Sequence, residues 1–104
     1  MVQMALLKVA TLSKLPPGSL IQVYSGDDAY AVCNVDGEVH VLDGICPHAA
    51  GPVGEGALHG HTVVCPWHAW EYDCRTGVCI FNDQVRLAKF PVRIQGDDIL
   101  IEAP

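Results

Sequence analysis

The sequence lacks any long apolar run. Half of its 104 residues are hydrophobic, but no run approaches the roughly 18 uninterrupted apolar residues of a membrane-spanning helix. The N-terminus has no basic start, long apolar centre or small-residue cleavage site, which argues against a secretory signal. Sustained helical periodicity and internal repeats are also absent. A single cytoplasmic domain covering residues 1–104 is therefore expected, without a membrane anchor.

Basic residues are scarce. The chain has 6 Lys and Arg against 12 Asp and Glu, which gives a formal net charge of −6 at pH 7. Because no basic patch is available to neutralise phosphates, a nucleic-acid partner is disfavoured. The acidic balance would steer the protein towards partners with basic surfaces, although it is equally typical of a protein that is simply soluble.

The 5 cysteines do not predict a disulfide framework, because an odd remainder in a chain without an export signal favours free thiols. Cys33 alternates with other apolar residues of an expected strand and is interpreted as a small core residue. Cys74 and Cys79 flank the turn at 75–78, where we expect them to face each other across a hairpin. A reduced, packed pair is favoured there over a disulfide.

The other two cysteines belong to two short motifs that each pair one Cys with one His. The first is Cys46-x-His48, and after 16 intervening residues the second is Cys65-x-x-His68. A proline follows each cysteine. Two separate loops that each offer a thiolate and an imidazole are expected to converge on one metal centre. Such ligands suit zinc or iron–sulfur chemistry rather than calcium or magnesium.

The order of Cys and His ligands along the sequence distinguishes a zinc site from an iron–sulfur cluster. Structural zinc sites usually pair like ligands in sequence, whereas each pair here is mixed. The pattern fits a [2Fe-2S] cluster in which two cysteines hold one iron and two histidines hold the other. We therefore predict Cys46, His48, Cys65 and His68 as the metal and cofactor ligands. A zinc site and four unconnected core residues are the competing interpretations.

Short strands dominate the rest of the chain. Runs of branched and aromatic residues separated by turn signals predict an all-β domain. Strands are expected at 5–10, 19–25, 29–35, 38–43, 62–64, 71–74, 78–80, 87–95 and 99–101. A helical turn capped by Thr11 is expected at 11–14, and a loop at 82–84. The Asp36-Gly37 pair predicts a two-residue hairpin turn with positive φ at both positions.

The hairpin built on that turn is expected to be covered on both faces. Tyr30, Val32, Val39 and Val41 would share one face, and Ala31, Cys33 and Leu42 the other. His40 would lie near Cys33 as an ordinary strand histidine. His59 and His61 are interpreted as exposed turn residues.

Several segments resemble soluble Rieske-type ferredoxins. They are both ligand motifs, the runs at 36–40 and 65–73, the Thr76-Gly77 turn and the run at 90–93. The resemblance covers nearly the whole chain. It implies the Rieske fold, which has three stacked antiparallel sheets and a cluster-binding subdomain, here at about 44–80, inserted into a base domain. It also implies that the two histidines bind the outer iron and the two cysteines the inner one.

The chain departs from the Rieske proteins of cytochrome bc-type complexes. Gly51 and Trp67 stand where that branch has two disulfide-bonded cysteines, and Trp70 stands where its serine hydroxyl hydrogen-bonds a cluster sulfide. Because fewer hydrogen bonds to sulfur lower the potential, we predict a value towards the lower end of the range of about −150 to +300 mV. Tyr72 would act in the opposite direction if its hydroxyl reaches a cysteine sulfur. Phe81 is the candidate cover of the cluster.

The resemblance implies a one-electron carrier, the ferredoxin component that passes electrons from a flavin reductase to a terminal oxygenase. The sequence has no glycine-rich nucleotide motif, and the cluster would use all four convincing ligands, so no catalytic residue is predicted. The alternative is the small Rieske subunit of an NAD(P)H nitrite reductase, with the large subunit as its partner. A zinc-stabilised interaction module is the second alternative.

Overall fold

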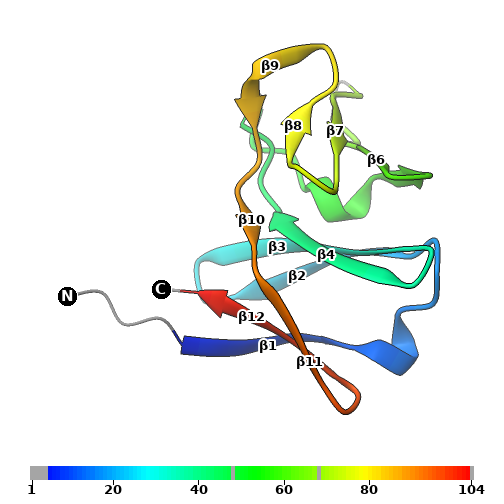
Figure 1. The fold of residues 1–104 in the computed structure, drawn as a ribbon. Coiled ribbons are helices and arrows are strands. Elements are labelled where there is room, and N and C mark those ends of the chain that lie inside the picture. The colour runs from blue at the N-terminus through cyan, green and yellow to red at the C-terminus, as the bar shows by residue number, and fades with distance from the viewer. Residues whose placement is uncertain (1–4, 48, 68, 104) are drawn as a thin grey trace.

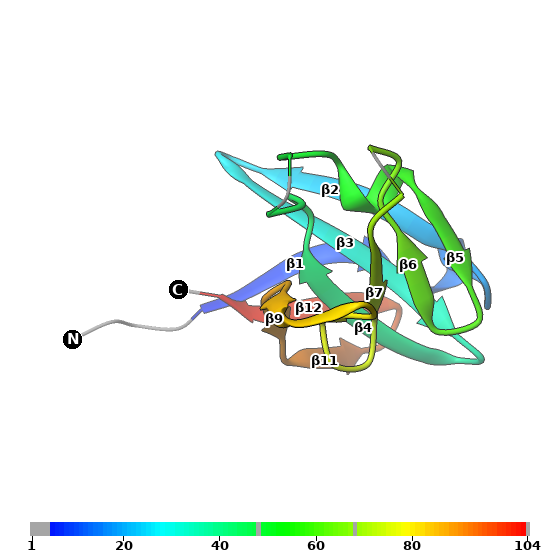
Figure 2. The same cartoon turned by 90° about the horizontal axis from the view of Figure 1, so that it is seen from above.

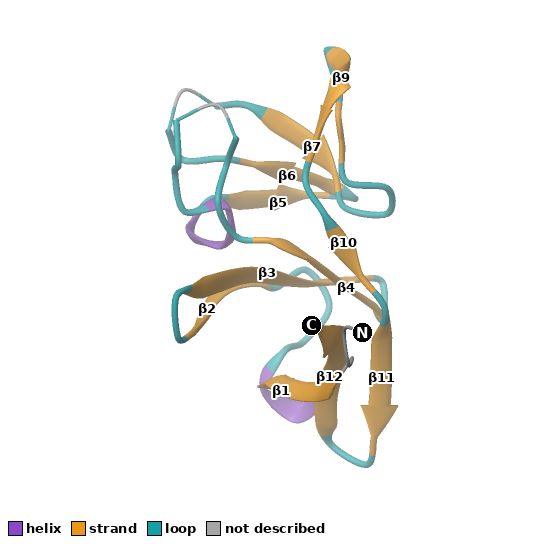
Figure 3. Ribbon diagram, turned by 90° about the vertical axis from the view of Figure 1, so that its left-hand side faces the viewer, coloured by secondary structure: helices purple, strands orange, loops and turns teal. Residues whose placement is uncertain are grey.

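The structure is a computed structural model that describes residues 5–47, 49–67 and 69–103. Its strands form three antiparallel sheets that stack in three layers (Figures 1 and 3). Two short 3-10 helices, η1 (Leu12–Lys14) and η2 (Val53–Glu55), are the helical elements of the described residues. The predicted all-β fold with three antiparallel sheets is confirmed. In the described part of the chain, no helix has the length and hydrophobicity to cross a bilayer.

The first sheet has the strand order β1–β12–β11 and pairs the two ends of the chain. Its strands are β1 (Ala5–Thr11), β12 (Asp98–Ala103) and β11 (Val92–Gln95). The single strand predicted at 87–95 is wrong, because the structure divides this segment into β10 (Lys89–Phe90) and β11. Pro91 stands between them, where the chain passes from one sheet to another and a residue without an N–H is tolerated.

The helical turn predicted after the first strand is present as η1, but the predicted cap is wrong. Thr11 makes no side-chain capping hydrogen bond. The Leu12 amide instead donates to the backbone oxygen of Asp97 at 2.8 Å, and the Ser13 hydroxyl donates to Asp97 Oδ2 at 2.6 Å. A residue 84 positions from Ser13 therefore takes the role that the local sequence assigned to Thr11.

The second sheet has the order β10–β4–β3–β2 and contains the predicted hairpin. Its remaining strands are β2 (Leu20–Ser25), β3 (Asp28–Val35) and β4 (Glu38–Asp43). The hairpin turn has φ of 52° at Asp36 and 95° at Gly37, so both values are positive as predicted. The resulting register places Cys33 opposite His40, also as predicted.

Both faces of this hairpin are buried. Tyr30, Val32 and Val41 pack with Ile99 and Ile101 of the first sheet, with the partly buried Val39 against them. On the other face, a second cluster joins the hairpin to the third sheet and includes Ala31, Cys33, Leu42, Val63 and Tyr72. The predicted division of the hairpin side chains is confirmed, and the hairpin forms the middle layer of the molecule (Figure 3).

The third sheet has the order β5–β6–β7–β8–β9 and lies above the hairpin in Figure 1, while Figure 2 looks down on it. Its strands are β5 (Ala57–His59), β6 (Thr62–Val64), β7 (Glu71–Asp73), β8 (Val78–Cys79) and β9 (Asn82–Arg86). The loop predicted at 82–84 is wrong, because these residues begin β9. They are exposed on an edge strand, where polar side chains are common despite their low β-propensity. The inserted subdomain at 44–80 stays a prediction, while the sheet itself continues to Arg86.

Cys74 and Cys79 do not face each other, so this expectation is wrong. Cys79 pairs with Tyr72 in the sheet, whereas Cys74 lies in the turn after β7, which the Gly77 amide closes on the Asp73 carbonyl at 2.6 Å. Cys74 instead lies with Cys33 in the buried cluster between the second and third sheets. Interaction with Cys74, followed by burial, raises the pKa of the Cys33 thiol, which therefore keeps its proton. All five cysteines are free.

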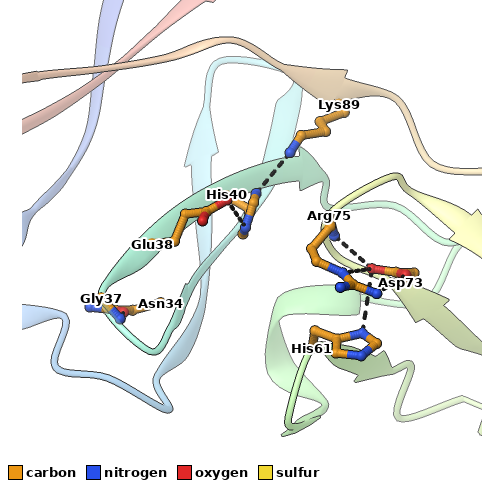
Figure 4. Close-up of polar contacts among 8 residues, drawn as sticks. All are labelled: Asn34, Gly37, Glu38, His40, His61, Asp73, Arg75 and Lys89. Carbon is orange, nitrogen blue, oxygen red and sulfur yellow. Dashed lines mark hydrogen bonds and ion pairs between the residues drawn. The ribbon is translucent and has the colours of Figure 1, made fainter.

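His40 is a buried strand residue with both ring nitrogens engaged, as Figure 4 shows. Nδ1 lies 2.7 Å from Lys89 Nζ, and Nε2 lies 3.0 Å from Glu38 Oε1. A protonated lysine only donates, so Nδ1 accepts, and the proton of the neutral ring is on Nε2. Burial, followed by the charge of Lys89, lowers the pKa of His40.

The side chain of Gln22 in β2 joins the two ends of the segment that contains the first cysteine motif. Nε2 donates to the Gly44 carbonyl at 2.8 Å, and Oε1 accepts from the Gly54 amide at 2.7 Å. A β-carbon at Gly44 would lie 2.8 Å from the Gln22 amide nitrogen, and one at Gly54 would lie 2.5 Å from its oxygen. Both positions therefore require glycine. The sequence gives no local sign of this contact, because the partners lie 22 and 32 positions away.

We expect the free energy of unfolding to decrease as the pH falls below about 6.5, the ordinary histidine pKa of an unfolded chain. The pKa of His40 is lower in the folded state, so below that ordinary value the unfolded chain binds more protons and stability is lost. Urea unfolding at a series of pH values measures this decrease. It should be smaller in His40→Gln, and an equal decrease in both proteins would contradict the assignment of a neutral His40.

We also expect Gln22→Met to lower the free energy of unfolding by about 2–4 kcal/mol. The methionine has a similar shape but leaves one backbone donor and one backbone acceptor without partners, at about 1–3 kcal/mol each. Urea unfolding measures the change. Gln84→Met, on the exposed strand β9, is the matched control and should change stability by less than about 0.5 kcal/mol. Equal effects of the two substitutions would rule out the bridging role of Gln22.

Candidate metal centre

The structure brings together the two predicted thiol ligands. Cys46 follows β4 and Cys65 follows β6, so they begin separate loops. Both are buried, with 1% of the surface exposed, and both belong to the same core cluster. Gly51, in the loop that Cys46 begins, lies close to Cys65 Sγ. Two residues that are distant in sequence therefore present sulfur atoms to one place.

The two predicted imidazole ligands, His48 and His68, lie outside the described residues. Among the residues that the structure describes, no group of three or more His, Cys, Asp or Glu side chains forms a metal site. The thiol half of the predicted ligand set can therefore be described, and the assignment of all four ligands stays a prediction.

The two cysteine loops are closed by equivalent backbone hydrogen bonds. The Cys46 amide donates to the Gly51 carbonyl at 2.9 Å, and the Cys65 amide donates to the Trp70 carbonyl at 2.8 Å. Each bond spans five positions. In both loops, the residue before the accepting carbonyl has a left-handed backbone: Ala50 (φ 59°) and Ala69 (φ 55°). Alanine rarely adopts this conformation, so the closed loops impose it on both residues.

The first loop approaches the second cysteine closely at Gly51. A β-carbon there would lie 2.9 Å from Cys65 Sγ and 2.9 Å from the Trp67 ring. Only glycine fits, and its small size brings the backbone close to the sulfur. Burial raises the pKa of the Cys65 thiol, and a hydrogen bond from the Trp67 backbone opposes that effect. Two buried thiols with backbone groups close to sulfur fit the thiolate half of a [2Fe-2S] site.

Tyr72 contacts the other thiol. Its Oη lies 3.1 Å from Cys46 Sγ, and both side chains are buried. A metal-bound cysteine sulfur has no proton to donate, so the tyrosine hydroxyl would then be the donor. Burial, followed by the hydrogen bond to Cys46, raises the pKa of Tyr72, so the hydroxyl keeps the proton that it donates. The condition set from the sequence, that Tyr72 reaches a cysteine sulfur, is met.

Exposed apolar side chains flank the two loops. Phe81 is 59% exposed and packs edge-on against Trp70, with ring centroids 5.3 Å apart and planes at 70°. It therefore lies against the second cysteine loop, while its role as a cover stays a prediction. We call the exposed apolar residues next to these loops the apolar rim: Ile45, Trp67, Ile80 and Phe81.

The histidines near the second motif belong to the sheet rather than to the thiol site. His59 is exposed, as predicted. His61 is only partly exposed, and its Nδ1 lies 3.6 Å from Asp73 Oδ1 (Figure 4). Arg75 also binds Asp73, at 3.1 Å, and this hydrogen bond is the main reason that the pKa of Asp73 is lowered. The three side chains form a polar contact at the turn that follows β7.

Comparison with known families and proteins identifies the chain. The Rieske [2Fe-2S] domain family matches residues 5–91. The ferredoxin component of biphenyl 2,3-dioxygenase from Rhodococcus jostii (strain RHA1) is 34% identical over 100 residues, which cover 95% of this chain and 94% of that protein. The ferredoxin component of the naphthalene 1,2-dioxygenase system from Pseudomonas aeruginosa is 29% identical over 92 residues, with 88% of each chain covered.

Solved structures agree with this relationship. The ferredoxin from Sphingomonas yanoikuyae B1 matches with a TM-score of 0.85 and 32% identity, over 94% of this chain and 98% of that chain. A complex of reduced oxygenase and oxidized ferredoxin in carbazole 1,9a-dioxygenase contains a chain that matches with a TM-score of 0.85 and 26% identity, over 93% of this chain and 92% of that chain. A Mycobacterium tuberculosis protein described as an NADH-dependent nitrite reductase small subunit matches with a TM-score of 0.84 over 99% of this chain and 98% of that chain, but its 19% identity shows the fold alone. With its two buried thiols at the ends of matching loops, this chain belongs to the Rieske [2Fe-2S] domain family.

Proposed function

We propose that this protein is a cytoplasmic one-electron carrier, the ferredoxin component that passes electrons from a flavin-dependent reductase to a terminal oxygenase. The observation that carries the proposal is the 34% identity to a dioxygenase ferredoxin component over nearly the whole length of both chains. The likeness to the nitrite reductase small subunit concerns the fold alone and adds no support for that alternative. The electron donor and acceptor are then two larger redox proteins.

The residues of the site suit this role. When bound, the [2Fe-2S] cluster accepts and releases one electron at a time. Cys46 and Cys65 would hold it through buried sulfur atoms, and His48 and His68 would complete the ligand set. The closed loops hold both cysteines in place, so electron gain requires little rearrangement. The apolar rim would exclude water where a partner docks, as the core of a protein interface does.

Anaerobically prepared protein should contain two irons and two acid-labile sulfides per chain, with Rieske-type visible and EPR spectra. In His48→Cys or His68→Cys, any retained cluster should have a lower potential, because an anionic thiolate disfavours electron gain more than a neutral imidazole does. Voltammetry measures the potential. His59→Cys, at an exposed position, is the control and should keep the original value.

Two outcomes would contradict the assignment or the role. Zinc in place of iron and sulfide would exclude the cluster. Co-purification of the chain from its source with a large sirohaem-containing subunit would replace the carrier role by the nitrite reductase alternative. Electron delivery from the reduced protein to a separate oxygenase, followed by stopped-flow spectroscopy, would support the carrier role.

Tyr72→Phe should lower the reduction potential. The hydroxyl stabilises charge on the Cys46 sulfur, and this charge increases on electron gain. A difference of about 1 kcal/mol in the strength of that hydrogen bond corresponds to about 40 mV for one electron. Tyr24→Phe is the control, since Tyr24 is 63% exposed and contacts neither cysteine. Equal potentials of Tyr72→Phe and the unsubstituted protein would show that the hydroxyl does not tune the site.

A further inference from the structure

A pocket with a volume of about 330 Å³ lies where the β2–β3 turn meets the end of β4. Three carboxylates and two aromatic rings line it: Asp27, Asp28, Asp43, Tyr30 and Phe90. We call it the aspartate pocket. Ile45, which belongs to the apolar rim, also lines it. The pocket therefore adjoins the first cysteine loop without including any predicted cluster ligand.

The three carboxylates have no counter-ion in the described part of the chain. The ion pairs found there involve other acidic residues. Asp43 accepts a hydrogen bond from the Ile45 amide at 3.0 Å, which adds no positive charge. The described residues also contain no group of three side chains close enough to hold a metal ion. The charges thus suit a cation larger than a metal ion, with several hydrogen-bond donors.

Tyr30 provides a second and independent indication of a ligand. Only 4% of its surface is exposed, and its ring packs edge-on against Phe90 at 5.2 Å. The Tyr30 side chain lines the pocket, and no other described residue hydrogen-bonds its hydroxyl. Burial, followed by the charges of Asp28 and Asp43, raises the pKa of Tyr30. Tyr30 is paired with Asp43 in the β3–β4 register and lines the pocket together with Asp28. Its hydroxyl keeps its proton, with the oxygen available as an acceptor.

We propose that the aspartate pocket binds the guanidinium group of an arginine side chain that projects from a redox partner protein. The dispersed carboxylates and the Tyr30 hydroxyl can accept hydrogen bonds from the five N–H donors of a guanidinium. A compact ammonium group matches these separated acceptors less well. The Phe90 ring offers an apolar wall on which the planar group can stack.

A protein surface is the source of this arginine because the pocket is continuous with the apolar rim through Ile45. A partner that covers the rim would bring its own side chains to the mouth of the pocket. This docking role rests on the proposed carrier function, whereas the affinity of the pocket for a guanidinium group does not.

The test uses the full-length protein with its cluster and the capped tripeptide acetyl-Gly-Arg-Gly-amide as the probe. NMR titration should give saturable shifts of the ring signals of Tyr30 and Phe90, and the affinity should fall with added salt. Tyr30→Phe and Asp43→Asn should each weaken binding by about threefold to tenfold, the loss expected for one hydrogen bond or charge contact. Asp36→Asn is the matched control. It removes the same charge at the far end of the hairpin, where asparagine tolerates the φ of 52°, and it should leave the affinity unchanged.

The same titration with the corresponding citrulline and lysine peptides identifies the group recognised. Weaker binding of both supports the guanidinium assignment, and equal binding of either one overturns it. An equal loss of affinity in Asp36→Asn and Asp43→Asn would mean that net charge, rather than the pocket, attracts the peptide, and would also overturn the proposal. If the protein delivers electrons but does not bind the arginine peptide, the proposed guanidinium site is wrong and the carrier function stands. Peptide binding in a protein that carries no cluster would contradict only the proposed function.

Discussion

The site depends on holding two thiols from separate loops in one buried cluster, in a protein of 104 residues. Cys46 and Cys65 are fully enclosed, so the backbone groups around them need partners other than water. Each loop meets this need by returning its own carbonyl to the cysteine amide five positions earlier. The left-handed alanines and the absence of a side chain at Gly51 are consequences of this tight closure. Local strain in the loops is therefore the result of placing sulfur atoms where water does not reach them.

The position of the first loop is set by contacts from two different sheets. Gln22, in the second sheet, binds the backbone on both sides of the loop, at Gly44 and Gly54. Tyr72, in the third sheet, binds the Cys46 sulfur directly. Since the β3–β4 hairpin packs against both outer sheets, these two contacts have a common rigid support. Without these contacts the loop would be an exposed connection that is free to move. Such movement would add to the structural rearrangement that accompanies electron transfer.

Features that depend on neighbouring residues could be predicted from the sequence. The Asp36-Gly37 turn needs only its own two backbone conformations, and the cysteine motifs are recognised by spacing alone. Features that depend on distant residues could not. Thr11 has the chemistry of a helix cap, but Asp97 occupies that place from the other end of the chain. Residues 82–84 have the composition of a loop, yet they begin an edge strand in which Asn82 pairs with Cys79 and Arg86 with Val78 of β8. Cys79 pairs with Tyr72 rather than facing its near neighbour Cys74, which lies in the buried cluster that also contains Cys33 of another sheet.

A carrier must bind two partners in turn and release each of them, so its docking surface has to combine fast association with modest affinity. The apolar rim has four exposed side chains and offers little area for tight binding. The net charge of −6 acts at longer range and raises the rate of encounter with a basic partner. The carboxylates of the aspartate pocket lie next to the rim and have no counter-ion, so they would orient a basic partner towards the cysteine loops. The same charge elsewhere on the surface would orient a partner away from them. Apolar contact near the cluster and charge beside it therefore have separate roles, one in excluding water and the other in orientation.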